Sequence, residues 1–352
     1  MRSSKPLAAA LILLSFSALP AIASGPASPF VHRKKYAMGT VFEMVVYDAS
    51  PAHASTAIDQ AFDAIARLDH LMSNYEPNSE LTKLNSSAKL HSQMVSADLY
   101  RVIEQSLEYS HISGGRFDVT VGPLVDLWKA AILGNGTPST AQQVAVRACV
   151  GYEKIHLVAP NQVAFVSPCL SIDLGGIGKG YAVDRAAEIL EAAGIKTALI
   201  DAGGSTIYAM GSPPGQTGWL VHMRDPSRQV DPTIVMSDES LSTSEQTPPS
   251  LLATISAGHI IDPETGVPLK THFAVSVVAR TATATDALST TLLLLGPEAG
   301  KRILAKIADT AAIWITPQGE LCTVSTGPAI VLGHQFRARL PGVVGLHRKG
   351  CE

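Results

Sequence analysis

A cluster of glycines around one lysine is the segment of this sequence with the most evident chemical capacity. Residues 173–180 read DLGGIGKG, and a helical pattern follows from Tyr181. Glycines before a helix expose peptide N–H groups at the positive end of the helix dipole. With the charge of Lys179 added, such a turn would bind a diphosphate. The alternative is a glycine-rich packing turn with a solvated lysine, and the stretch alone favours neither.

Two common phosphate-binding motifs do not fit this stretch. A P-loop has a Ser or Thr directly after its lysine, where the hydroxyl binds Mg²⁺, but this sequence has Gly180 there. A dinucleotide-binding fingerprint beginning at Gly176 would need its last glycine where Tyr181 stands. If the segment binds a phosphate, it does so as a turn of another kind.

A second polar group lies further along the chain. Asp286, Ser289 and Thr290 have the i, i+3, i+4 spacing that places side chains on one face of a helix. One carboxylate with hydroxyls is a hard-oxygen set suited to Mg²⁺, which keeps several waters and takes few protein ligands. Helix capping by Asp and Thr is the alternative, and the helical pattern alone favours it. A metal beside a diphosphate would neutralise charge where phosphoryl transfer requires it.

The remaining candidates are single residues. His259 precedes two apolar residues and a turn at 262–266. A lone histidine is usually structural, but a neutral imidazole near the transfer site could take a proton from a hydroxyl. Tyr75, Phe117 and Trp128 could offer flat faces to a flavin ring, although aromatic residues in a chain of this size more often belong to the core.

The elements that must position these residues alternate between strand and helix. Apolar periodicity predicts helices over 57–72, 98–111, 181–193 and 284–295, and glycines end the last two. Buried strands are predicted over 171–174, 197–200 and 275–279. The alternation predicts a mixed α/β (α+β) domain.

Composition narrows the class of protein. The 352 residues carry a net charge of -3 and 46% hydrophobic residues, which is typical of a globular protein without a basic surface for nucleic acid. Residues 1–23 combine a short basic start, an apolar run and a small-x-small end at Ala23. This pattern predicts a cleaved signal peptide, with an uncleaved anchor as the less favoured alternative. No cysteine directly follows the apolar run, so a lipid anchor is not expected. The run is broken by Ser15, Ser17 and Pro20 and is short for a bilayer, so no transmembrane segment is expected after cleavage.

The four cysteines fit no zinc-binding spacing. Cys149 and Cys169 flank two short strand-like runs, 154–158 and 162–166, which a turn at 159–161 could fold into a hairpin. An oxidising compartment would allow the two sulfurs to pair. Two buried free thiols are the alternative, and the sequence favours neither.

Taken together, these segments resemble the ApbE family, the FAD:protein FMN transferases of bacterial envelopes. The resemblance covers roughly Tyr36–Lys301, and the motifs follow the order of the family. The matching segments are 38–40, 73–84, 115–128, 173–180, 201–204, 259–266 and 286–290. The resemblance implies a single T-fold-like domain with an FAD cleft over residues 36–320, after a linker at 24–35 and before a tail of unknown role at 321–352.

The resemblance also implies a reaction and a location. Family members split the diphosphate of FAD with Mg²⁺ as cofactor, release AMP, and attach FMN to a Thr or Ser hydroxyl of a target flavoprotein. FAD is thus a substrate, and the expected partner is a flavoprotein subunit of a membrane redox system. The expected location is the periplasm.

Roles follow residue by residue from the resemblance. Residues matching flavin or FAD contacts are Met38, Tyr75, Arg116, Phe117, Asp118, Asp173 and Lys179. Asp286 and Thr290 match Mg²⁺ ligands, Ser289 is a third position near the metal, and the carbonyl of Gly176 completes the set. His259 matches the histidine that contacts FAD and activates the acceptor hydroxyl, so it and Asp286 are the expected catalytic residues.

One loop departs from the family pattern. The family shows Thr-Ser-Gly, whereas Glu245 follows Thr243-Ser244 here. Because this loop lies on the acceptor side, the choice of protein substrate stays open. Two alternatives keep the same pocket: an FAD diphosphatase that yields FMN and AMP, and a non-catalytic periplasmic flavin-binding protein.

Overall fold

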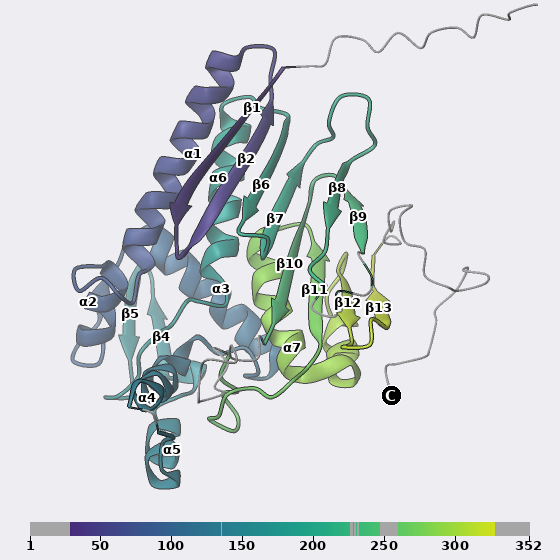
Figure 1. Cartoon of the computed structure of the whole chain (residues 1–352). Helices are drawn as coiled ribbons and strands as arrows, with labels where there is room; N and C mark the ends of the chain where they lie inside the picture. The colour runs from purple at the N-terminus through teal and green to yellow at the C-terminus, as the bar shows by residue number, and fades with distance from the viewer. Residues whose placement is uncertain are drawn as a thin grey trace, which may run out of the picture.

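Eight strands form one antiparallel sheet, in the order β1-β2-β6-β7-β10-β11-β12-β13 (Figure 1). The computed structural model describes residues 29–327 except 135, 226–227, 229, 231 and 247–259. The strands are β1 (Phe30–Ala37), β2 (Thr40–Tyr47), β6 (Thr197–Ala202), β7 (Thr206–Met210), β10 (Glu239–Glu245), β11 (Ala274–Ala279), β12 (Ala311–Ile315) and β13 (Leu321–Ser325).

Three helices pack on one face of this sheet: α1 (Pro51–Met72), α6 (Gly178–Ala192) and α7 (Ala282–Leu304) (Figure 1). Helix α1 begins where the Ser50 hydroxyl accepts a hydrogen bond from the backbone of His53, and its buried side chains recur at helical spacing. Apolar residues of α1 and α6 join those of β2 and β6 in one core, while α7 packs against β11 and β12. The order α1-α6-α7 places the starts of α6 and α7 beside each other.

Two small sheets complete the fold. The sheet β8-β9 packs its apolar residues against the face of the main sheet opposite the helices. The sheet β3-β5-β4 lies with α2, α4 and α5 beyond one end of the main sheet (Figure 1). The remaining elements are β3 (Gln93–Met94), β4 (Ile155–Val158), β5 (Gln162–Phe165), β8 (Trp219–His222), β9 (Thr233–Met236), α2 (Glu80–Ser87), α3 (Ala97–Ser113), η1 (Val119–Val121), α4 (Gly122–Leu133), α5 (Thr140–Arg147) and η2 (Tyr152–Lys154).

The predicted mixed α/β domain is confirmed, and so are its four helices. The helix expected to end at Gly296 does break there, because Gly296 has φ 71° and Pro297 follows it. A further helical stretch then continues to Leu304, which the sequence analysis did not predict. In the part of the chain that the structure describes, no helix combines the length and apolar character that crossing a membrane requires.

The predicted strand over 171–174 is wrong. The N–H groups of this segment bond to partners other than a neighbouring strand. The N–H of Ile172 donates to Asn85 Oδ1 at 2.8 Å, and the N–H of Asp173 donates to the carbonyl of Val119 at 2.7 Å. These bonds to α2 and η1 fix the segment that leads into the glycine turn.

The boundaries of the main sheet lie outside the predicted domain limits. Strand β1 begins at Phe30, inside the predicted linker 24–35, and β13 occupies Leu321–Ser325, inside the predicted tail 321–352. Both are edge strands with exposed polar residues, so their apolar pattern is weak in the sequence. The predicted signal peptide 1–23 lies outside the described residues.

The cysteine pair that the sequence left open is a disulfide. Cys149 and Cys169 are bonded, with Cα atoms 5.3 Å apart. Strands β4 and β5 form the expected hairpin between them. No described cysteine is a free thiol. The bond ties the end of the α5 region to the chain that precedes the glycine turn.

Candidate functional site

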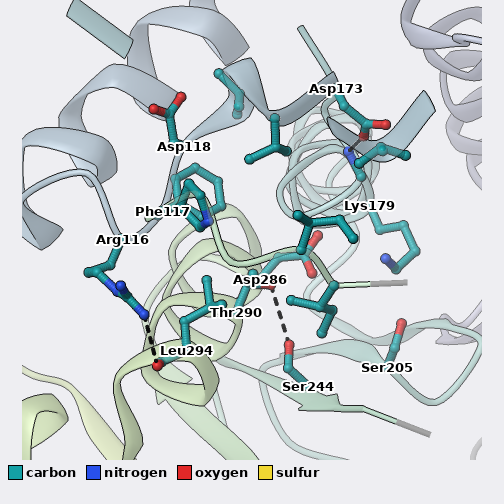
Figure 2. Close-up of a pocket in the computed structure, with 18 of the residues that line it drawn as sticks. Arg116, Phe117, Asp118, Asp173, Lys179, Ser205, Ser244, Asp286, Thr290 and Leu294 are labelled. Atoms are coloured by element: carbon teal, nitrogen blue, oxygen red, sulfur yellow. Dashed lines mark hydrogen bonds between the residues drawn. The ribbon is translucent and has the colours of Figure 1, made fainter. Parts of the chain in front are cut away.

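A pocket of ≈ 330 Å³ opens where the glycine turn, α7 and the end of β10 meet (Figure 2). Its volume lies in the range of small-molecule sites. Nine of the residues predicted to form the site line it: Tyr75, Arg116, Phe117, Asp118, Asp173, Gly176, Lys179, Asp286 and Thr290. Segments far apart in the sequence therefore converge on one cavity.

The glycine turn leaves two peptide N–H groups available beside the pocket. Four neighbouring amides are used within the protein: Gly175 donates to Asp173 Oδ1, Ile177 and Gly178 donate to the carbonyl of Leu174, and Gly180 donates to Asp286. The amides of Gly176 and Lys179 have no partner among the described residues, and both residues line the pocket. Ile177, the residue at the start of α6, has no side chain that could cap these amides. Unpaired amides at a helix start favour an anion.

Asp286 joins the two helix starts. It is 5% exposed, lines the pocket, and accepts a hydrogen bond from the Gly180 N–H through Oδ2 at 2.9 Å. This bond occupies one carboxylate oxygen and leaves Oδ1 available. Figure 2 shows Asp286 near the centre of the cavity, with Thr290 one helical turn further along α7.

A pair of hydroxyls from β10 and α7 supports this face. Ser289 is fully buried; its hydroxyl donates to the carbonyl of Asp286 at 3.0 Å and lies 2.8 Å from Ser244 Oγ. Ser244 Oγ is also 3.4 Å from Thr290 Oγ1 and lines the pocket. Ser289 itself is not among the lining residues. The structure therefore places Ser289 behind the pocket, where it packs α7 on β10, and brings Ser244 to the surface that the sequence analysis gave to Ser289.

The oxygen donors of the pocket fit a magnesium ion. Among the described residues, no group of three His, Cys, Asp or Glu side chains lies close enough together to hold a metal ion. Three oxygen donors are available instead: the carboxylate of Asp286, the hydroxyl of Thr290 and the backbone carbonyl of Gly176. A Cβ placed on Gly176 would lie 3.5 Å from Thr290 Oγ1, so turn and helix are in contact. Few protein ligands, all hard oxygens, are what Mg²⁺ accepts.

The cations around the pocket differ in their availability. Arg116 is paired with Asp262 at 3.1 Å and with Glu264, and it also donates to the carbonyl of Leu294 at 3.3 Å. Lys179, in contrast, has no hydrogen bond or ion pair with any described residue. It is half-buried beside the free amides of the turn. Lys179 is thus the cation best placed to meet an anionic ligand.

Asp118 holds the wall of the pocket together. Its carboxylate accepts hydrogen bonds from the N–H and hydroxyl of Thr120, at 2.8 and 2.6 Å, and from the N–H of Tyr152 at 2.9 Å. Burial raises the pKa of Asp118, and these hydrogen bonds oppose the rise. The neighbouring Phe117 is 3% exposed and packs edge-on against Tyr109.

Met38 lies under the glycine turn rather than in the pocket lining. Met38 and Gly39 form the two-residue turn between β1 and β2, and both have positive φ, as such hairpin turns require. The Met38 side chain reaches toward Gly178, because a Cβ added to this glycine would lie 3.6 Å from the Met38 terminal carbon. His259, the predicted base, lies outside the described residues.

Two cations at the rim, Lys129 and Arg224, were not predicted from the sequence, whereas their partners Tyr75 and Glu245 were singled out there. Lys129 donates to the Tyr75 hydroxyl at 3.0 Å, and its Nζ lies 4.9 Å from the centre of the Tyr75 ring, which is 81% exposed. Arg224 donates to Glu245 at 3.2 Å. All four residues line the pocket. Of the lining residues that were not predicted, Ser244 is the one with a signal in the sequence. The alternating hydroxyls at 240, 242 and 244 place it on one face of β10.

A model of the ApbE family matches residues 38–314. The "FAD:protein FMN transferase" of Treponema pallidum is 30% identical over 81% of this chain and 84% of its own length. That of Escherichia coli K12 is 28% identical over 91% of this chain and 96% of its own length.

Solved structures agree with these sequence matches. The "Flavin Transferase ApbE from Vibrio cholerae" superposes with a TM-score of 0.74 at 26% identity, and it covers 86% of this chain and 98% of that chain. The family match spans most of the chain and contains both the glycine turn and the α7 oxygens. The chain belongs to the ApbE family.

Proposed function

We propose that this protein transfers FMN from FAD to a Thr or Ser hydroxyl of a target protein and releases AMP. The matched relatives are named FAD:protein FMN transferase, and the named solved structure is a flavin transferase. The observation that carries the proposal is a single cavity shared by two features. The free amides and cation of the glycine turn face the same space as Asp286 and Thr290.

The glycine turn would hold the diphosphate of FAD. The N–H groups of Gly176 and Lys179 provide two neutral donors at the start of α6, and the Lys179 ammonium provides a charged one. Charge-assisted hydrogen bonds to phosphate are stronger than neutral ones. Such fixed donors stabilise the charge that develops on the phosphoryl oxygens, because they require no reorganisation during the reaction.

Asp286, Thr290 and the Gly176 carbonyl would hold Mg²⁺ in this proposal. When bound, the ion supplies neutralisation of phosphoryl charge. The protein residues fix the two ends of the transfer: the turn orients the diphosphate, and Ser244 keeps the Thr290 hydroxyl in place. The proton of the acceptor hydroxyl would pass to His259, and a general base of this kind contributes about 10²–10⁴ in rate.

The acceptor in this proposal is a flavoprotein subunit of a membrane redox system, met in the periplasm after export. The predicted signal peptide 1–23 supports the location. The Arg224–Glu245 pair lies at the rim, where the sequence departs from the family pattern. An acceptor chain would meet this pair on its way to the diphosphate.

The test is a transfer assay with purified protein. The mature chain, FAD, Mg²⁺ and an acceptor domain are incubated, and the acceptor is examined by denaturing gel fluorescence and mass spectrometry. One covalently bound FMN per acceptor, with AMP released in equal amount, supports the proposal. Free FMN and AMP without modified acceptor would identify an FAD diphosphatase instead. Bound FAD that stays intact would identify a flavin-binding protein.

A further inference from the structure

Helices α6 and α7 each supply a carboxylate to the start of the other. Asp286 of α7 accepts the N–H of Gly180 in the first turn of α6. In return, Asp184 of α6 accepts the N–H groups of Ala282 and Thr283 at 2.7 and 2.8 Å, and the Thr283 hydroxyl at 2.5 Å. Ala282 and Thr283 form the first turn of α7. The two helix starts are therefore bonded to each other in both directions.

The backbones of the two helices touch at this point. A Cβ on Gly180 would lie 2.2 Å from the carbonyl oxygen of Ala282 and 2.8 Å from Cβ of Asp286. The glycine permits an approach that any other residue would prevent. Because the contact lies between backbones, a shift of the α7 start carries Asp286 with it.

Asp184 has no part in the pocket itself. It is absent from the lining residues, and its side chain is directed to the α7 backbone. Burial raises the pKa of Asp184, and its three hydrogen bonds only partly oppose the rise. Burying a carboxylate lowers stability unless hydrogen bonds compensate, and here the first turn of α7 supplies three. These bonds tie Asp184 to the start of α7.

We propose that Asp184 is a positioning residue that fixes the first turn of α7 and thereby sets the place of Asp286 in the pocket. Asp184 holds the helix start at Ala282 and Thr283, and Asp286 follows one turn later. With the first turn of α7 fixed, Asp286 Oδ2 accepts the Gly180 N–H, and Oδ1 remains available for Mg²⁺. The consequence for Mg²⁺ rests on the proposed function; the effect on the Asp286–Gly180 bond does not.

Glu80 provides a matched control. Its carboxylate likewise accepts a backbone N–H and a hydroxyl at the start of another helix, those of Ser96 at the start of α3, at 2.5 and 2.7 Å. Helix α3 contributes no residue to the pocket. Loss of the Glu80 bonds should therefore lower stability without affecting Asp286.

The test compares Asp184→Ala, Asp184→Asn and Glu80→Ala in the mature protein. The first readout is hydrogen exchange at the Gly180 amide, resolved by NMR. We expect Asp184→Ala to raise the exchange rate of this amide at least ~10-fold relative to Glu80→Ala, with Asp184→Asn between Asp184→Ala and the wild-type protein. The milder Thr283→Ala removes one of the three bonds and should act in the same direction if Asp184→Ala does not fold. Unchanged Gly180 protection in the folded Asp184 variants would overturn the proposal.

The second readout is calorimetric titration with Mg²⁺ in the presence of FAD. Loss of a residue that orients a metal ligand costs roughly 10–100-fold in metal affinity. We expect that loss in Asp184→Ala, with FAD affinity in EDTA unchanged, and no loss in Glu80→Ala. Equal Mg²⁺ affinity in both variants would contradict the positioning role. If wild-type protein itself takes up no Mg²⁺, the proposed function fails, while the exchange rate of Gly180 still decides whether Asp184 positions Asp286.

Discussion

Lys179 differs from the other cations of the pocket because it has no hydrogen bond or ion pair with any described residue, whereas Arg116, Lys129 and Arg224 each have a partner. We expect Lys179→Ala to weaken FAD binding by about 10-fold or more, since a hydrogen bond to a charged group contributes roughly 1.5–3 kcal/mol. Lys179→Arg should retain most of the affinity. Fluorescence titration with FAD measures the effect, with the exposed Lys306→Ala as control. Equal affinity in Lys179→Ala and Lys306→Ala would show that Lys179 is merely solvated.

Asp286 combines two functions that one substitution can separate. Asp286→Asn keeps an oxygen that can accept the Gly180 N–H but removes the charge. We therefore expect transfer of FMN to be lost while FAD affinity falls only in part and folding stability is nearly unchanged. Transfer rate, FAD titration and thermal unfolding distinguish the three quantities. Wild-type transfer by this variant in EDTA would disprove the metal-binding role.

At the scale of elements, helical spacing was the informative signal. The i, i+4 pattern placed Asp286 and Thr290 on one face of a periodic helix, and the family resemblance then assigned that face to the site. Lys129 and Arg224 reach the pocket only through packing between elements distant in sequence, and no local pattern marks them. Ser289 shares the helical spacing but is turned toward β10 rather than the pocket. Periodicity thus identified the helix face without resolving which hydroxyl is buried behind it.

The contact between α6 and α7 depends on a missing side chain. Gly180→Ala would place a Cβ 2.2 Å from the carbonyl oxygen of Ala282, so the helices must separate. Overpacking of this kind costs about 1–3 kcal/mol, and occasionally more. We expect lower unfolding free energy together with weaker Mg²⁺ uptake, because Asp286 moves with α7. Denaturant unfolding and Mg²⁺ titration measure the two effects.

Gly134→Ala serves as the control for this prediction. Gly134 ends α4 with negative φ, and a Cβ there meets its nearest neighbours at 3.5 Å, an ordinary contact distance. This substitution should leave stability within about 0.5 kcal/mol of wild type. Equal effects of Gly180→Ala and Gly134→Ala would mean that the helix starts tolerate separation.

For the whole molecule, the sequence predicted the class of fold but not the order of the strands in its main sheet. Alternating strands and helices correctly indicated a mixed α/β domain. The pairing of β2 with β6 and of β7 with β10 brings together segments that long insertions separate, and pairing partners at such distance leave no local trace. The pocket could not be predicted from local patterns for the same reason, because it forms only when the folded sheet places α6 beside α7.

The disulfide acts on the stability of the molecule as a whole. Cys149 and Cys169 are 20 residues apart, and closing a loop of that length contributes about 3 kcal/mol through the entropy of the unfolded chain. The double variant Cys149→Ala, Cys169→Ser should lose that amount in urea unfolding. Site-directed substitution is required because Cys322 is also disulfide-bonded, so a reducing agent would not act on one bond alone. Since neither cysteine lines the pocket, FAD affinity of the folded variant should match wild type. A large loss of FAD affinity at unchanged stability would instead make the bond part of the binding site.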